Sequence, residues 1–153
     1  MENRYLFKAQ RVDNGEWVVG NLITNVFFRL GQSIPYILCP DKAEYDCFED
    51  FSEGNGIFEV RPETICRCTG SPDRNGQLIF ENDILHNGNY FVVKWNAPCA
   101  RFDIVLNNSH NIPIGKWEPM ICDWKTNDFK EYRKAVDYEV LGNIFDNPEL
   151  LEV

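Results

Sequence analysis

Short apolar runs alternate with clusters of turn-forming residues along most of the chain. The first two runs flank Asp13-Asn14-Gly15, and the Asn-Gly dipeptide accepts the positive φ angles of a tight hairpin turn. Further runs of strand length occupy residues 34–39, 57–60, 63–69, 76–80, 83–85, 89–95, 101–106 and 138–145. The pattern therefore predicts a mainly β protein.

Three segments interrupt this pattern. Residues 40–51 combine an initial Pro, early acidic residues and aromatic residues at near-helical spacing, which predicts a short amphipathic helix. Residues 126–136 have an Asn or Asp cap and basic residues near their end, which predicts a second short helix. Residues 107–121 are punctuated by Pro, Gly and Asn and predict a long loop with at most one strand, while residues 147–149 begin a terminal helical turn.

The stretch Thr69–Leu85, TGSPDRNGQLIFENDIL, has the residues of a hairpin turn followed at once by apolar positions. We expect Asn75-Gly76 to join two antiparallel strands, with Ile79 and Ile84 buried and Arg74 exposed. The loop also resembles part of a calcium loop that starts at Ser71, with Asp73, Asn75 and Gly76 at its third, fifth and sixth positions. The first and last positions fail, because they hold Ser71 and Asn82 in place of Asp and the bidentate Glu. The hairpin is the better interpretation.

The other chemical candidates are weaker than their structural alternatives. Cys66 and Cys68 share a predicted strand face, but no Cys-x-x-Cys pair accompanies them, so packing is favoured over a zinc site completed by Cys39 and Cys47. Glu81 and Asp83 lack a nearby nucleophile and are expected to be solvated turn carboxylates. A triad of Cys99, His110 and Asp103 has no supporting motif. Several aromatic residues are expected to fill the core and not to stack on nucleobases: Phe91, Trp95, Phe102, Trp117 and Trp124.

Charge and cysteine usage restrict the function classes. The formal net charge of −9 disfavours nonspecific binding to duplex DNA, because such binding depends on clustered Lys and Arg. The acidic residues concentrate in Asp41–Glu53, and a small basic segment covers Lys125–Lys134. The N-terminal residues do not resemble a signal peptide and no apolar run has membrane-spanning length, so a cytoplasmic location is expected. There the six cysteines should be reduced and act as small buried hydrophobic residues.

Three stretches together resemble the YopX family of bacteriophage and prophage proteins. They are RYLFKAQRVDNGEWVVGNL at residues 4–22, with Trp17 and a strand-ending Gly20, then VRPETICRCTG running into the quoted turn, and YEVLGNIFDNPELL near the C-terminus. Where the family usually reads Glu-Gly-Asp-Ile, this chain has Asn82 in place of Gly, and Asn is the residue that best replaces Gly at positive φ.

The resemblance implies a single unit, residues 1–153, with a β-rich N-terminal lobe at residues 1–68 and an SH3-like barrel lobe at residues 69–153. It implies that the barrel is closed by Tyr138–Phe145. The family brings no established catalytic, cofactor-binding or metal-binding residues, so no site residue and no cofactor is expected.

The expected function is that of a non-enzymatic protein-binding module in the bacterial cytoplasm. Two alternatives stay open: a small barrel that binds nucleic acid through Lys125–Lys134, and an acidic mimic that presents Asp41–Glu53 to a DNA-binding protein. Self-association of the chain into a homo-oligomer also stays open.

Overall fold

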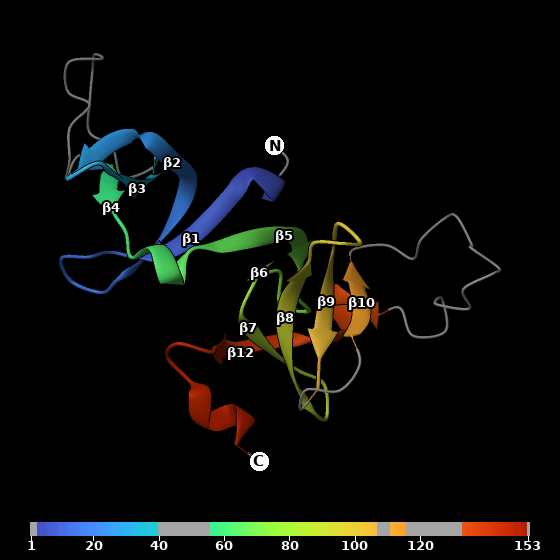
Figure 1. Cartoon of the computed structure of the whole chain (residues 1–153). Helices are drawn as coiled ribbons and strands as arrows, with labels where there is room; N and C mark the ends of the chain where they lie inside the picture. The colour runs from blue at the N-terminus through green and yellow to red at the C-terminus, as the bar shows by residue number, and fades with distance from the viewer. Residues whose placement is uncertain (1–2, 40–55, 107–110, 116–132, 153) are drawn as a thin grey trace. The chain divides into compact units, whose positions relative to one another are not determined.

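The computed structural model describes residues 3–39, 56–106, 111–115 and 133–152. The chain divides into two compact units, Met1–Arg67 and Cys68–Val153, which we call unit 1 and unit 2. Figure 1 shows that both are built from strands, and the described residues add only short 3-10 turns. The prediction of a mainly β protein is therefore confirmed.

Unit 1 contains an antiparallel sheet in which neighbours in the sequence are neighbours in space. Its strand order is β4-β3-β2-β1, and the first two residues of β5 pair with β1. The predicted Asn14-Gly15 hairpin joins β1 to β2, with Gly15 at a φ of 74°. The elements are η1 (Asn3–Tyr5), β1 (Leu6–Gln10), β2 (Trp17–Arg29), β3 (Gln32–Leu38), β4 (Ile57–Glu59), η4 (Pro62–Thr64) and β5 (Cys66–Pro72).

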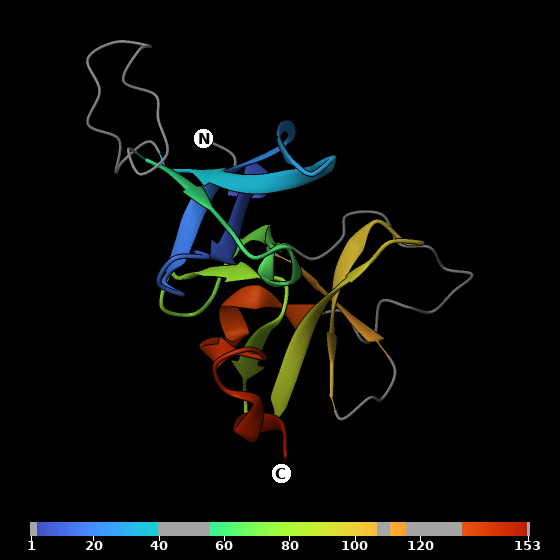
Figure 2. The ribbon, with the colours of Figure 1, turned by 60° about the vertical axis from the view of Figure 1, so that its left-hand side comes forward.

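The long strand β2 continues well past the glycine at which we expected it to end. Gly20 lies inside β2, where an added Cβ would collide with the carbonyl oxygen of Leu38 on β3. The glycine therefore permits close approach of two backbones and does not end the strand. Further along, the pairing with β3 shifts between Ile23 and Phe27, where Asn25 has a φ of 60°. Figures 1 and 2 show β2 curving along its length.

The core of unit 1 comes from alternate positions of these strands, as the period-2 pattern requires. Its buried members are Ala9, Val18, Ile37, Cys39, Phe58 and Val60, and Phe7, Leu22 and Ile65 pack against them.

Unit 2 contains a second sheet, in the order β11-β10-β9-β8-β7-β12. All its pairs are antiparallel except β10 with β11, and β5 pairs separately with β6. Its elements after β5 are β6 (Leu78–Phe80), β7 (Asp83–His86), β8 (Tyr90–Asn96), β9 (Arg101–Val105), β10 (Asn111–Gly115), β11 (Arg133–Lys134), η6 (Ala135–Asp137), β12 (Glu139–Asn143) and η7 (Pro148–Leu151). The core is formed by Ile79, Leu85, Phe91, Val93, Ile104, Ile114, Ala135 and Tyr138.

The quoted stretch Thr69–Leu85 folds as predicted. β5 and β6 pair antiparallel across Asn75-Gly76, Ile79 and Ile84 are buried, and Arg74 is exposed. Asn82 has a φ of 66°, as expected of a residue that replaces Gly at the bend.

The helical segments were predicted less well. The helix expected in residues 40–51 and the acidic stretch Asp41–Glu53 lie outside the described residues. Of the helix expected in residues 126–136, only residues 133–136 are described, and they are not α-helical: Arg133 and Lys134 form β11, which pairs in parallel with β10, and a 3-10 turn begins at Ala135. The strand expected from residue 63 begins only at Cys66, because Pro62–Thr64 form a 3-10 turn. The terminal helical turn after Asn147 is present as η7.

Candidate functional site

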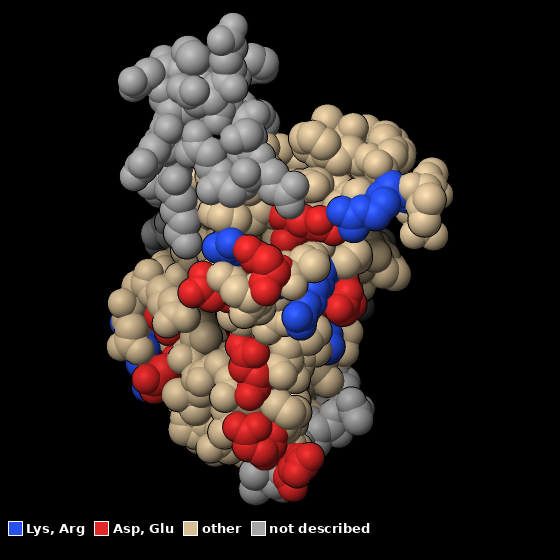
Figure 3. Space-filling view, turned by 90° about the vertical axis from the view of Figure 1, so that its left-hand side faces the viewer, with Lys and Arg blue, Asp and Glu red and all other residues tan. Residues whose placement is uncertain are grey.

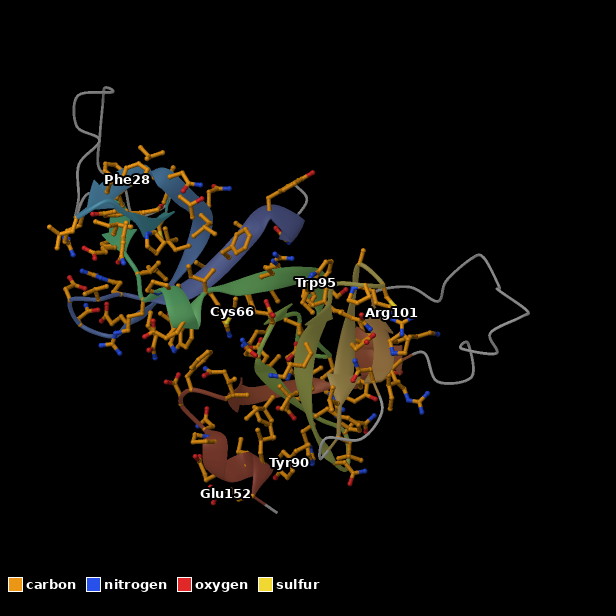
Figure 4. All side chains as sticks on the ribbon, viewed as in Figure 1. Phe28, Cys66, Tyr90, Trp95, Arg101 and Glu152 are labelled. Carbon is orange, nitrogen blue, oxygen red and sulfur yellow. The ribbon has the colours of Figure 1, made fainter. Side chains whose placement is uncertain are left out.

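The outer half of the β2–β3 hairpin exposes an unusual number of apolar side chains. Val26 is 62% exposed, Phe28 60% and Leu30 100%, and Phe27 is also exposed although its ring lies 4.7 Å from that of Tyr36. Figure 4 shows Phe28 on the outer part of the ribbon. Beyond Asn21, β2 has no partner on its β1 side among the described residues, so this half is a two-stranded ribbon. Clustered exposed apolar residues mark interaction surfaces more often than isolated ones do.

Leu30 and Gly31 form the turn at the tip of the ribbon. Their φ angles are 51° and 79°, the signature of the type I′ turn, which favours Asn-Gly and disfavours branched apolar residues in its first central position. Leu30 therefore occupies a strained conformation while its side chain is 100% exposed, so burial does not offset the strain. Packing among the described residues of unit 1 does not explain this leucine.

A groove of about 380 Å³ lies beside the hairpin, where β3 and the chain after β4 separate. Hydrogen bonds join β3 to β4 and the residue after it, and the last of them runs from the Val60 backbone N–H to the Pro35 carbonyl, at 3.1 Å. The chain then turns away, because the Arg61 N–H donates to the Gln10 carbonyl at 2.9 Å and not to β3. The groove is the space left in this fork. Its apolar walls come from Val12, Leu30, Ile34, Pro35 and Pro62.

The charged side chains that line the groove have more positive than negative charge. Arg29 donates two hydrogen bonds to the Glu59 carboxylate, at 3.3 and 3.1 Å, and Arg29 remains 65% exposed. Arg61 also lines the groove, and it is exposed, with no side-chain hydrogen bond or ion pair to another described residue. Since the described lining residues hold two arginines and one carboxylate, the groove carries one excess positive charge in a chain of net charge −9.

Arg11, by contrast, is fully engaged close by. Its Nε donates to Asp13 Oδ1 at 2.9 Å, and its guanidinium lies 4.2 Å from the centre of the Phe58 ring. The hydrogen bond with Asp13 raises the pKa of Arg11, and the same bond lowers the pKa of Asp13. Arg11 therefore closes the β1–β2 loop and is not a ligand for the groove.

Asp73 and Asp83, two of the carboxylates that the sequence offered as candidates, accept hydrogen bonds from backbone N–H groups. Asp73 Oδ1 accepts from the Asn75 and Gln77 N–H groups, and its Oδ2 accepts from the Val140 N–H. These oxygens therefore accept hydrogen bonds from backbone N–H groups of the hairpin and of β12. The expectation of solvated carboxylates was wrong for Asp83, which is buried and accepts from the Phe80 N–H at 2.8 Å.

Two members of the candidate triad that no motif supported, Cys99 and Asp103, lie among the described residues. Asp103 is fully buried and accepts from Asn96 Nδ2 and Arg101 Nε, while His110 lies outside the described residues. Cys99 is exposed, which corrects the expectation that all six cysteines are buried. Figure 4 places Arg101 near Trp95, at neighbouring ends of β9 and β8.

Three of the remaining cysteines pack inside the protein. Cys39, Cys66 and Cys68 are buried, and the burial pattern of β5 places the last two on one face. Cys47 and Cys122 lie outside the described residues. No group of three or more His, Cys, Asp or Glu residues that could hold a metal ion occurs in the part of the chain that the structure describes.

The candidate aromatic residues divide between core and periphery. Phe91 is buried, and Trp95 and Phe102 are half-buried with their ring centres 4.9 Å apart. Trp117 and Trp124 lie outside the described residues. None of the described helices has the length and apolar composition needed to cross a membrane.

Sequence reasoning missed the hairpin tip and the groove. The available signal was the run Val26-Phe27-Phe28-Arg29-Leu30-Gly31, in which consecutive apolar residues break the alternation of a half-buried strand.

Comparison with known proteins gives one family match. The model of the YopX protein family matches residues 33–152. This range does not include residues 4–22, the first of the three stretches that resemble the family. No curated protein matches the chain.

Proposed function

We propose a function from the premise that the chain belongs to the YopX protein family, which the match over residues 33–152 shows. The chain is a non-enzymatic module that binds another protein through the outer half of the β2–β3 hairpin. The observation that carries this proposal is Leu30, fully exposed at a φ of 51° in a turn that favours a small polar residue. Strain that contributes nothing to folding points to a contact made with a partner.

The setting proposed for this binding is a bacterial cytoplasm during expression of a phage or prophage, as the YopX resemblance implies. Protein is favoured over nucleic acid as the partner. Figure 3 shows one face of the molecule on which blue and red side chains are interspersed, with no broad basic patch of the kind that phosphate backbones require. The net charge of −9 acts in the same direction.

For unit 2 we propose an SH3-like barrel. Its support is the antiparallel run β7, β8 and β9, together with the return of β12 to the free edge of β7. Fold alone does not fix the ligand of such a barrel, so the binding proposal rests on the hairpin of unit 1.

The test is capture of host proteins by the immobilised full chain. Wild type is compared with the double variant Leu30→Asn and Phe28→Ser, and with Leu141→Asn as control, because Leu141 is a partly exposed leucine of unit 2. We expect a protein captured by wild type and by Leu141→Asn to be lost from the double variant. Equal capture by all three would refute the hairpin as the binding site. Micromolar binding of single-stranded or duplex DNA that persists at near-physiological salt would refute a protein as the principal partner.

A further inference from the structure

We infer that the groove beside the hairpin accepts an extended segment of the partner protein as an added strand on the open edge of β3, with a carboxylate of that segment directed at Arg61. This inference rests on the proposed protein-binding function and specifies the partner's chemistry.

The backbone of β3 offers the required hydrogen-bonding groups. Arg29 and Gln32 pair across a two-residue turn, so they form the last hydrogen-bonded pair of the ribbon, and Phe28 and Ser33 form a non-hydrogen-bonded pair. The backbone N–H and C=O of Ser33 consequently point away from β2. They lie on the side on which the Pro35 carbonyl accepts from Val60, which is the side of the groove.

β4 would have covered this edge if it had continued in register. Tyr36 pairs with Glu59, so continued antiparallel pairing would bring residues 61–63 opposite Ile34, Ser33 and Gln32. The turn of Arg61 towards Gln10 prevents this and leaves the edge over Gln32–Ile34 without a strand partner among the described residues. An extended peptide supplies the missing strand, the recognition mode called β-augmentation.

The lining of the groove selects the composition of that segment. Leu30, Ile34 and Pro35 offer contacts for apolar side chains, and a volume of about 380 Å³ suits only a few residues. The excess positive charge at Arg61 favours a carboxylate, because Glu59 is already bonded to Arg29. The occupant is therefore a short, extended, apolar segment that carries an acidic residue.

The probe is a library of random twelve-residue peptides displayed on phage and selected against the immobilised full chain. We expect the enriched peptides to combine apolar residues at alternate positions with an Asp or Glu. Peptides enriched without any acidic residue, or no enrichment above the bare support, would overturn the inference.

The enriched peptide is then titrated against a matched pair of variants. Ser33→Pro and Ser33→Ala both lose the hydroxyl that accepts from the Asn25 N–H, but only Ser33→Pro also removes the edge N–H. We expect Ser33→Pro to bind roughly three- to tenfold more weakly than Ser33→Ala, the effect of one hydrogen bond. Equal affinities, with both variants folded by circular dichroism, would exclude an added strand.

Arg61→Gln tests the carboxylate. We expect it to weaken peptide binding severalfold and to reduce the salt dependence, and an unchanged affinity would overturn this part of the inference. If wild type sediments as a dimer that Ser33→Pro dissociates, the edge is filled by a second copy and the inference fails. Loss of host-protein capture in the Leu30→Asn, Phe28→Ser variant would still support the proposed function if the peptide results were negative.

Discussion

Replacement of Leu30 by Asn should leave unit 1 as stable as before or more stable, although an apolar residue is lost. Leu30 is 100% exposed, so no buried apolar area is removed and the hydrophobic contribution of the change is close to zero. An L-residue in the left-handed region is disfavoured by about 1–2 kcal/mol, and Asn tolerates that region better than Leu. We therefore expect a gain of about 0.5–1 kcal/mol in the free energy of unfolding.

The matched variant is Gly31→Ala, at the next residue of the same turn. Gly31 has a φ of 79° and an added Cβ would meet no atom within 4 Å, so the substitution isolates the backbone effect. We expect a loss of about 1–2 kcal/mol. The polar substitution Leu30→Asn should thus stabilise the protein, and the apolar substitution Gly31→Ala should destabilise it. Hydrophobicity alone would suggest the opposite for both.

Urea unfolding followed by tryptophan fluorescence and circular dichroism measures both effects, and for domains of this size about 1 kcal/mol shifts the Tm by about 2–8 °C. A loss of more than about 1 kcal/mol in Leu30→Asn would mean that the leucine packs against the protein. In that case its exposure could not be used as evidence for a partner, and the proposed binding site would lose its principal support.

Three further substitutions test the fold. Asp73→Ala should cost about 2–5 kcal/mol in urea unfolding, since it leaves three backbone N–H groups without their acceptor; a loss below 1 kcal/mol would show that water replaces the carboxylate. Gly20→Ala should cost about 1–3 kcal/mol or prevent folding, because its Cβ collides with the Leu38 carbonyl; wild-type stability would mean that β2 and β3 separate easily. Burial raises the pKa of Tyr138, so the unfolded state ionises first and stability should fall as the pH rises above about 10. Tyr138→Phe should reduce that fall and the exposed control Tyr5→Phe should not, and identical alkaline profiles would contradict this assignment.

Local sequence signals predicted the strands and two of the tight turns. Asn14-Gly15 and Asn75-Gly76 carry the dipeptide that a hairpin requires, and their flanking residues alternate, so both hairpins were predicted. The Leu30-Gly31 turn was missed because Leu is a poor residue for its first position. The turn rule thus failed at Leu30, the same residue whose conformation packing among the described residues does not explain.

Other features depended on contacts that are distant in sequence. Arg133 and Lys134 have a helix-like sequence context, but parallel pairing with β10 makes them a strand. Asp83 looks like a turn carboxylate, and only burial against the Phe80 N–H shows its structural role. The groove exists because Arg61 bonds to Gln10 and not to β3. No local pattern specifies that choice, so the groove could not be predicted from the sequence, whereas the apolar run of residues 26–31 was a signal for the hairpin tip.

The two oxygens of Asp73 also set an order of events during synthesis on the ribosome. Oδ1 accepts from the N–H of Asn75 in the local turn. Oδ2 accepts from the N–H of Val140, which is synthesised 67 residues later. β12 likewise pairs with β7, so the sheet of unit 2 cannot be completed until residues 139–143 have left the ribosome. Strands β1–β4 follow one another both in the sequence and in the sheet, and the strand partner that unit 1 gains later is β5, which pairs with β1 at Cys66 and Arg67. The nascent chain should therefore present the hairpin of unit 1, already formed, while unit 2 is still unfinished and needs protection from aggregation.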